Sequence, residues 1–388
     1  MKQRMRRRSG ALLSVAAMSV MSIASLGIGA SGSGAATSRG TSNGENVAYA
    51  KARVARYSKV PTWKAPGPAV NVASLKGQLI FDVPGLSTDE YVQQDILAEK
   101  AIAEKAGIKF VEYPTTGPVS QEVAGIREAI SQKANMLFLD QGVDISAVQT
   151  EVKAAIKAGI KVVYAHALDT SQSCPTNVNA CEFVQFQLGH KLMVDAAVAA
   201  ADGKPITGLF LTDNELPSEV LLTKAFDSEF AKVCGPKCKL YTITSPAATW
   251  ATQLSTSVAS ELAAHPSINW VFPEFDSVGL LAMGGVRSAG RASTIKISTF
   301  NGSLAALQAV YSGPNFVSDV AEDPIYLAYA TMDQVFRVMT AMKPIAHLSG
   351  PLRIFNASDI GQVGKPPKAY GGFGTAFQTG YLKLWGLG

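Results

Sequence analysis

The sequence lacks the short motifs of most nucleotide-dependent and hydrolytic enzymes. It contains no GxxxxGK[ST] phosphate loop and no HExxH zinc motif, and no GxGxxG loop or GxSxG elbow follows a predicted strand. Histidine is scarce, with 4 residues in 388. These absences argue against an ATPase, a dinucleotide-dependent enzyme or a common exported hydrolase.

Only one hydrophobic run is long enough to be a targeting or membrane segment. It extends over Ala11–Ile28, follows a basic head and precedes a Gly/Ser/Ala stretch with processing points near Ala30 or Ala36. Four serines interrupt the run, which favours a cleaved signal peptide (residues 1–36) over a membrane anchor. The cluster Arg6–Arg8 leaves both general and twin-arginine export open. We therefore expect an extracytoplasmic protein.

The excess of positive charge belongs to the same segment. The whole chain carries a formal charge of +5, and the basic head contains five Lys and Arg residues. Without them, 30 basic residues face 30 acidic ones. A near-neutral mature chain gives no electrostatic support for a nucleic-acid partner.

Cysteine is also rare, and its four residues form two close pairs. In an exported chain, this even count and local spacing predict two small-loop disulfides. A zinc site would need CxxC-like spacing and neighbouring histidines, so we expect no metal and no cofactor. We expect His190 and His347 to be surface residues. The cysteine pairs are Cys174/Cys181 and Cys234/Cys238.

Strand and helix patterns alternate from Gly77 onward, after an amino-terminal extension with a Pro-rich connector (37–76). One series of strand–helix units closes at His166, and a second begins after Cys181. Alternation of this kind predicts parallel sheets with helices on both faces. The expected fold class is therefore α/β, with two doubly wound lobes.

Several ordered patterns resemble the type I periplasmic solute-binding proteins of ABC importers, in the ribose- and galactose-binding branch. They are the KAGIKVV unit at Lys157–Val163, the helix–His–Pro–strand block Leu262–Phe272, the turn Thr299–Gly302 and the hinge-like Val320–Pro324. The resemblance covers about Gly77 to Ala346. It implies two lobes joined by three crossovers that close on a solute like a hinge.

The resemblance also implies how the chain divides. The Cys174–Cys181 disulfide would staple the first crossover and restrict the hinge. The tail from about Leu348 would return to the second lobe. The expected division is 77–180 with 323–347 in lobe 1, and 181–322 with 348–388 in lobe 2.

Ligands of open α/β sheets bind at the carboxyl ends of the strands. Polar and aromatic side chains there suit a solute with hydroxyls and an apolar ring face. Some of these residues have structural alternatives: Asn214 and Asp276 as helix caps, and Tyr91 as a core residue. The candidate ligand-binding residues are Asp82, Tyr91, Asp140, His166, Asn214, Trp250, Phe275, Asp276, Asn301 and Glu322.

Departures from the sugar-binding pattern bear on the ligand. Phe275 replaces an expected Asn, His166 replaces an acid, and the arginine expected near Val220 is absent. Loss of a bidentate arginine weakens the case for a small, hydroxyl-rich pentose. The alternative ligand is a less polar or aromatic solute.

The resemblance implies a monomeric solute-binding subunit that binds a sugar or related small molecule and docks with an ABC transporter permease. The alternative is a sensory binding protein that delivers its solute to a receptor. The sequence does not separate the two, because it does not reveal the docking surfaces. Binding would shift an open–closed equilibrium without chemistry, so the resemblance implies that the protein is not an enzyme.

Overall fold

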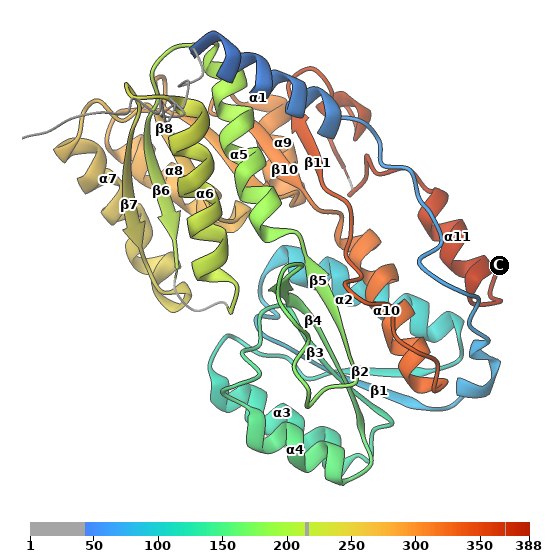
Figure 1. Cartoon of the computed structure of the whole chain (residues 1–388). Coiled ribbons are helices and arrows are strands. Elements are labelled where there is room, and N and C mark those ends of the chain that lie inside the picture. Colours follow the sequence, from blue (N-terminus) through green and yellow to red (C-terminus); the bar gives the residue numbers. More distant parts are fainter. Residues whose placement is uncertain (1–42, 214–216, 369) are drawn as a thin grey trace, which may run out of the picture. The chain divides into compact units, whose positions relative to one another are not determined.

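The alternating strands and helices form two sheets, one parallel and one parallel except for its edge strand, each covered by helices on both faces (Figure 1). The computed structural model describes residues 43–213, 217–368 and 370–388. The predicted signal peptide and Asn214 lie outside these residues. The predicted α/β class with two doubly wound lobes is confirmed. Within the described chain, no helix combines the length and apolar character needed to cross a membrane.

The first lobe contains a five-stranded parallel sheet of order β2-β1-β3-β4-β5. Helices α3 and α4 pack together on one side of it, and α2 and α10 pack together on the other (Figure 1). The strands are β1 (Leu79–Pro84), β2 (Lys109–Glu112), β3 (Met136–Asp140), β4 (Lys161–Asp169) and β5 (Ala180–Val184). The helices are α2 (Glu90–Lys105), α3 (Val119–Ser131), α4 (Gln149–Lys157) and α10 (Pro324–Met339).

The second lobe contains a six-stranded sheet of order β11-β10-β9-β8-β6-β7, in which only β11 is antiparallel to its neighbour. Helices α5 and α6 cover one face, and α7, α8 and α9 cover the other (Figure 1). The strands are β6 (Thr207–Thr212), β7 (Lys239–Thr244), β8 (Trp270–Pro273), β9 (Lys296–Asn301), β10 (Phe316–Ala321) and β11 (Arg353–Asn356). The helices are α5 (Phe186–Ala201), α6 (Glu219–Cys234), α7 (Ser255–Ala264), α8 (Asp276–Ser288) and α9 (Leu304–Ser312).

Strand alternation decides which side chains fill each core. Phe210, Phe272 and Phe300 point toward α5 and α6, and the Phe210 ring stacks on Phe226 of α6 with centroids 4.3 Å apart. Each phenylalanine is completely buried, and burying such a side chain stabilises the fold by about 1.5–3 kcal/mol. This aromatic core holds the second lobe's strands in place beneath the cleft.

The chain passes between the lobes at three places: between β5 and α5, between β10 and α10, and between α10 and β11. The Glu322–Pro324 crossover lies where the sequence pattern indicated. The first crossover comes later than expected, because β5 extends the first sheet to Val184. Consequently Cys174 and Cys181, whose Sγ atoms are 2.05 Å apart, both lie in the first lobe. This disulfide braces the β4–β5 loop and does not staple the crossover.

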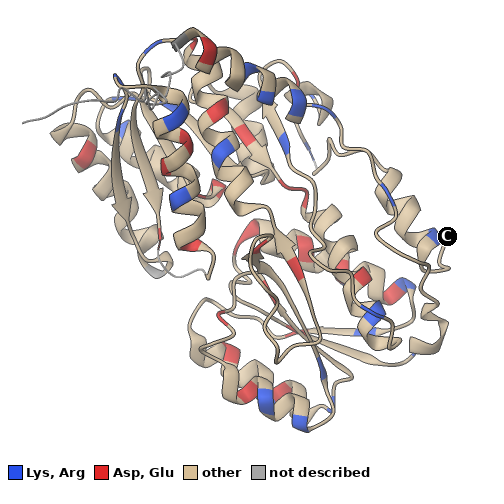
Figure 2. Cartoon of the chain, in the orientation of Figure 1, with Lys and Arg blue, Asp and Glu red and all other residues tan. Residues whose placement is uncertain are grey.

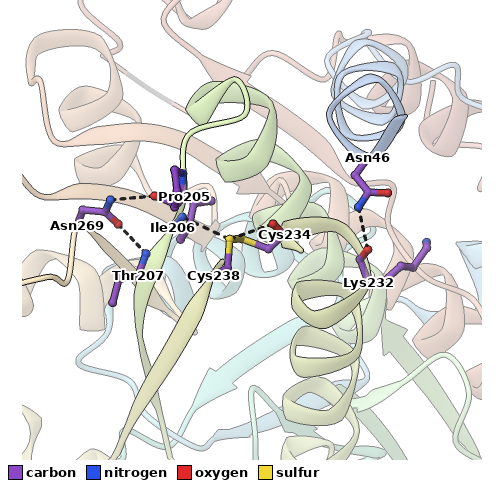
Figure 3. Close-up of a disulfide and its surroundings, with 8 residues drawn as sticks. All are labelled: Asn46, Pro205, Ile206, Thr207, Lys232, Cys234, Cys238 and Asn269. Atoms are coloured by element: carbon purple, nitrogen blue, oxygen red, sulfur yellow. Dashed lines mark hydrogen bonds between the residues drawn. A yellow bond between two sulfur atoms is a disulfide. The ribbon is translucent and has the colours of Figure 1, made fainter. Parts of the chain in front are cut away.

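The second predicted disulfide also forms. The Sγ atoms of Cys234 and Cys238 lie 2.15 Å apart, joining the end of α6 to the residue before β7 (Figure 3). The neighbouring Lys232 carbonyl accepts a hydrogen bond of 3.3 Å from the Asn46 side chain of α1 (Asn43–Tyr57). The amino-terminal extension therefore contacts the second lobe directly.

Both terminal segments contact both lobes. The extension begins on α5 and α6 as α1 and then reaches the first lobe, where the Pro68 carbonyl accepts a hydrogen bond from the buried Arg337 of α10. The tail contributes β11 to the second sheet and then α11 (Ala376–Leu384), which packs on α10. Trp385 donates a 2.8 Å hydrogen bond to Asp333 of α10. The tail thus ends on the first lobe instead of staying with the second.

Candidate solute-binding site

A cavity of about 340 Å³ lies where the carboxyl ends of the two sheets face each other. Residues 41–388 form one compact unit, so both lobes contribute to the same cavity. The structure brings six of the ten predicted residues together around it: Tyr91, His166, Trp250, Phe275, Asp276 and Asn301.

Aromatic rings form a continuous wall of the cavity. Tyr91 and His166 have ring centroids 5.7 Å apart, and His166 and Phe186 have centroids 5.9 Å apart. Phe186 in turn lies 6.4 Å from Phe275 of the second lobe. The indole of Trp250 is held by a 2.9 Å hydrogen bond to the Ser245 carbonyl. Such rings suit the apolar face of a sugar or another flat solute.

His166 of this wall pairs with Glu322, which lies outside the cavity lining. His166 Nε2 lies 2.9 Å from Glu322 Oε2, and the Tyr91 hydroxyl donates to the same oxygen at 3.3 Å. Burial alone would lower the pKa of His166, but the charge of Glu322, its hydrogen bond and the charge of Asp95 raise it. Glu322 itself does not line the cavity. It positions two residues that do.

Three cavity residues have left-handed backbone, which is uncommon for residues other than glycine. The φ angles are 59° at Gln141, 52° at His166 and 132° at Asn301. The β4–β5 register shifts between Tyr164 and Leu168, so His166 lies in an irregularity of the strand. Such local strain at strand ends is typical of functional sites, where it aims side chains toward a ligand.

The turn that carries Asn301 is fixed from below by Asp276. Its carboxylate accepts hydrogen bonds from the Thr299 hydroxyl (2.8 Å) and the Ser303 amide (2.7 Å). Burial raises the pKa of Asp276 to about 7, although these hydrogen bonds oppose the shift. Gly302 is required in this turn, because its φ is 84° and a Cβ atom would lie 2.5 Å from that of Ala321. Asp276 therefore holds the turn and does not cap the helix that follows it.

Asp82 and Asp140 were expected to face a ligand, but the structure places both away from the cavity. They are completely buried, and their carboxylate oxygens have no hydrogen-bond partner in the described chain. Alternation along β1 and β3 directs them to the sheet face that α2 covers, beside Ile80 and Phe138. Desolvation raises the pKa of each acid well above its usual value.

The structure adds cavity residues that are not among the ten candidates. Phe186 and Gln141 line the cavity, as do the apolar side chains of Leu86 and Leu280. Phe186 follows the first crossover directly. It was not a candidate because the sequence pattern placed this crossover before β5. His190, expected at the surface, is completely buried. His347 is exposed, as expected.

His190 supports the cavity from behind. Its Nδ1 atom lies 2.8 Å from the Phe186 carbonyl, and its ring centroid lies 6.5 Å from that of Phe275. Burial lowers the pKa of His190 to about 4. A neutral imidazole therefore packs against the aromatic wall.

A two-lobed α/β fold with a cavity between the carboxyl ends of its sheets defines a class of receptor for small molecules. Residues 80–343 match the family described as periplasmic binding protein domain. The chain belongs to this family.

The sequence is 23% identical over 303 residues to the ribose import binding protein RbsB of Bacillus subtilis (strain 168), covering 76% of this chain and 91% of that protein. Many solved structures share the fold, and two of them illustrate it. One is an ABC transporter solute-binding protein from Mycobacterium smegmatis with bound glycerol (TM-score 0.65, 18% identity, 76% and 98% of the two chains). The other is a 5-methylthioribose transporter solute-binding protein from Thermotoga lettingae (TM-score 0.65, 14% identity, 79% and 93%).

Proposed function

We propose that the chain is the extracytoplasmic solute-binding subunit of an ABC importer, and that it binds a sugar or sugar-like molecule between its lobes without chemistry. One observation supports this most strongly: the strand ends of both sheets supply the cavity's aromatic and polar side chains. A solute held there contacts both lobes and favours the closed arrangement. The family match and the solute-bound relatives support the same role.

The residues that line the cavity restrict the class of solute that we propose. Lysine and arginine are absent from the described residues that line it, whereas Asp89, Glu90 and Asp276 are present. The imidazole of His166 is already paired with Glu322, so an anionic solute would meet no uncompensated cation in this lining. We therefore propose a neutral solute with hydroxyl groups and one apolar face. Phe275 and Phe186 also support the alternative of a less polar or aromatic solute.

A thermal-shift screen tests the proposed function. The purified protein is heated with monosaccharides, polyols, methylthio sugars and aromatic acids in parallel. We expect one neutral class to raise the melting temperature in a saturable way. Stabilisation by acidic sugars alone, or turnover of any ester or glycoside, would contradict the proposal.

The proposed permease partner needs a separate measurement. The purified solute-bound protein is mixed with the candidate permease in lipid nanodiscs, and ATP hydrolysis is recorded with and without the binding protein. We expect stimulation only in the presence of solute. Binding to a receptor kinase or chemoreceptor with no effect on any permease would favour the sensory alternative.

A further inference from the structure

The face of α2 that packs on the first sheet is acidic over its first half. Asp95 and Glu99 lie one helical turn apart, so they project from the same side. Their exposed fractions are 1% and 0%. The same stripe continues with Ile102 and Ala106, which are buried and apolar as expected for a core face. The two acids therefore occupy positions where the helix otherwise carries hydrophobic side chains.

Two further acids face them from the sheet. Asp140 ends β3, and it groups with Asp95 and Glu99 so that one oxygen of each lies within 4.8 Å of the others. Asp82 of β1 projects from the same face of the sheet. It lies close enough for its charge to raise the pKa values of Glu99 and Asp140. Asp82 is completely buried, and neither of its oxygens has a hydrogen-bond partner in the described chain.

Among the described residues, His166 acts on Asp95 through its charge, but no lysine or arginine compensates these acids. None of the ion pairs among the described residues joins a lysine or arginine to Asp82, Asp95, Glu99 or Asp140. Acidic residues gather where α2 lies over the first sheet (Figure 2). Burying ionised carboxylates without a counter-charge is strongly unfavourable, so the group needs protons or a cation.

The donor set selects the kind of cation. Carboxylate oxygens are hard ligands, and the group contains neither sulfur nor nitrogen, which favours Ca²⁺ or Mg²⁺ over zinc or copper. Oxygens up to 4.8 Å apart fit around an ion with metal–oxygen distances of about 2.3–2.6 Å, which is the range of Ca²⁺. We propose that Asp95, Glu99 and Asp140 bind a Ca²⁺ ion beneath the solute cavity, with Asp82 as a fourth acidic ligand.

The proposed ion lies next to the solute site. The Gln141 side-chain amide donates a 2.5 Å hydrogen bond to Asp95, and Gln141 also lines the cavity. Ca²⁺ bound to Asp95 fixes the acceptor that orients this amide, so it connects the ion site to the cavity. The ion site itself rests on the acidic group alone and does not depend on which solute the protein binds.

A similar group in the second lobe adjoins residues 214–216, which lie outside the described chain. It consists of Asp213, Glu219 and Glu274. It matters for the experiment, however, because it is an alternative place for Ca²⁺. The test must therefore locate the ion as well as detect it.

Calorimetry with CaCl₂ tests the proposal on chelator-treated full-length protein. We expect saturable binding by the wild type and at least about tenfold weaker binding by Glu99→Gln and Asp140→Asn, because each loses a charged ligand. Glu104→Gln is the matched control: it makes the same change at an exposed position of the same helix. Its affinity should equal that of the wild type.

Folding of the variants is checked without calcium. Gln resembles a protonated glutamic acid, so Glu99→Gln should melt no earlier than the wild type in chelator, and only the wild type and Glu104→Gln should gain stability with Ca²⁺. Anomalous scattering from terbium-soaked crystals of the wild type locates the bound ion without the use of a variant. We expect a peak between α2 and β3. No binding up to about 1 mM Ca²⁺, unchanged affinity in Glu99→Gln, or a peak only elsewhere would overturn the proposal.

Discussion

His166 Nε2 and Glu322 Oε2 lie 2.9 Å apart and join the two lobes beneath the cavity. His166 comes from β4 of the first lobe, and Glu322 follows β10 of the second. Both side chains are almost completely buried. The pair therefore links solute contact in one lobe to a crossover between the lobes.

We predict that Glu322→Gln lowers the pKa of His166. The carboxylate raises this pKa against the effect of burial, so its removal leaves desolvation less opposed. Asp95 and Glu182 also lie near His166 and remain in the variant. Because the folded state raises the pKa of His166, the charged pair stabilises the fold fully below the unfolded-state pKa. This stabilisation is lost as the pH rises through the folded-state pKa.

Histidine NMR titration of the wild type and Glu322→Gln measures this shift. Glu261→Gln provides the control, because Glu261 lies 3.3 Å from the more exposed His265 and should leave His166 unchanged. A His166 pKa that stays the same in Glu322→Gln would show that the pair is not charged.

We predict that Phe275→Ala weakens binding of the preferred solute about tenfold to a hundredfold. The ring lines the cavity and packs near Phe186, so its loss removes apolar contact of about 1.5–3 kcal/mol. Phe275→Asn should move the preference toward more polar solutes. Calorimetry checks both, with the exposed aromatic Tyr311→Ala as control. Affinities that do not change would place Phe275 outside the binding surface.

We predict that His190 destabilises the protein in acid. Its folded-state pKa is about 4, below the unfolded value of about 6.5, so stability is lost as pH falls between these values. The full effect is about 3 kcal/mol near pH 4. Denaturant unfolding of His190→Gln should therefore show a weaker loss between pH 6.5 and 4 than the wild type. The control His347→Gln, at an exposed position, should lose stability with falling pH as the wild type does. An equal loss in His190→Gln would contradict a lowered pKa of His190.

We predict that Arg53 of the extension stabilises the second lobe. Its guanidinium lies 2.9 Å from Asp195, which is completely buried, and 3.2 Å from Glu229. Arg53→Ala leaves Asp195 without its cation and should lower the free energy of unfolding by about 2 kcal/mol at pH 8. The exposed pair Lys51–Asp202 is the comparison, and Lys51→Ala should cost no more than about 1 kcal/mol.

The double variant Arg53→Ala, Asp195→Asn separates charge from packing. It should recover part of the lost stability, because the uncompensated carboxylate is gone. Denaturant unfolding of the wild type, Arg53→Ala, Lys51→Ala and the double variant gives the four free energies of unfolding. An equal effect of Arg53→Ala and Lys51→Ala would mean that burial of Asp195 adds nothing to the interaction.

Periodicity and strand-end position predicted the fold and part of the site. Phe275 and Asn301 line the cavity, because the end of a parallel strand and the start of the next helix can be recognised in the sequence. Trp250 also lines the cavity, but it was a candidate through the family resemblance and not through a strand end. Asp82 and Asp140 illustrate the limit. Strand alternation and the packing of α2 decide which face they occupy, and those depend on tertiary structure.

The acidic half of α2 was missed for a related reason. Helical periodicity does not show whether Asp95 and Glu99 face solvent or the sheet, because that depends on how α2 packs. His190 was missed because a histidine in an amphipathic helix carries no sign of its burial. The path of the tail could not be predicted either, since Trp385 and Asp333 meet only in the folded chain.

Equilibrium binding of the solute found by the thermal-shift screen tests the central claim most directly. The solute is titrated calorimetrically into the wild type and into the cavity variant Trp250→Ala, and it is then recovered and identified by mass spectrometry. We predict one solute per chain, chemically unchanged, with affinity reduced at least about tenfold in the variant. Conversion of the solute, or equal affinity in both proteins, would contradict a binding protein that uses the cavity between its lobes.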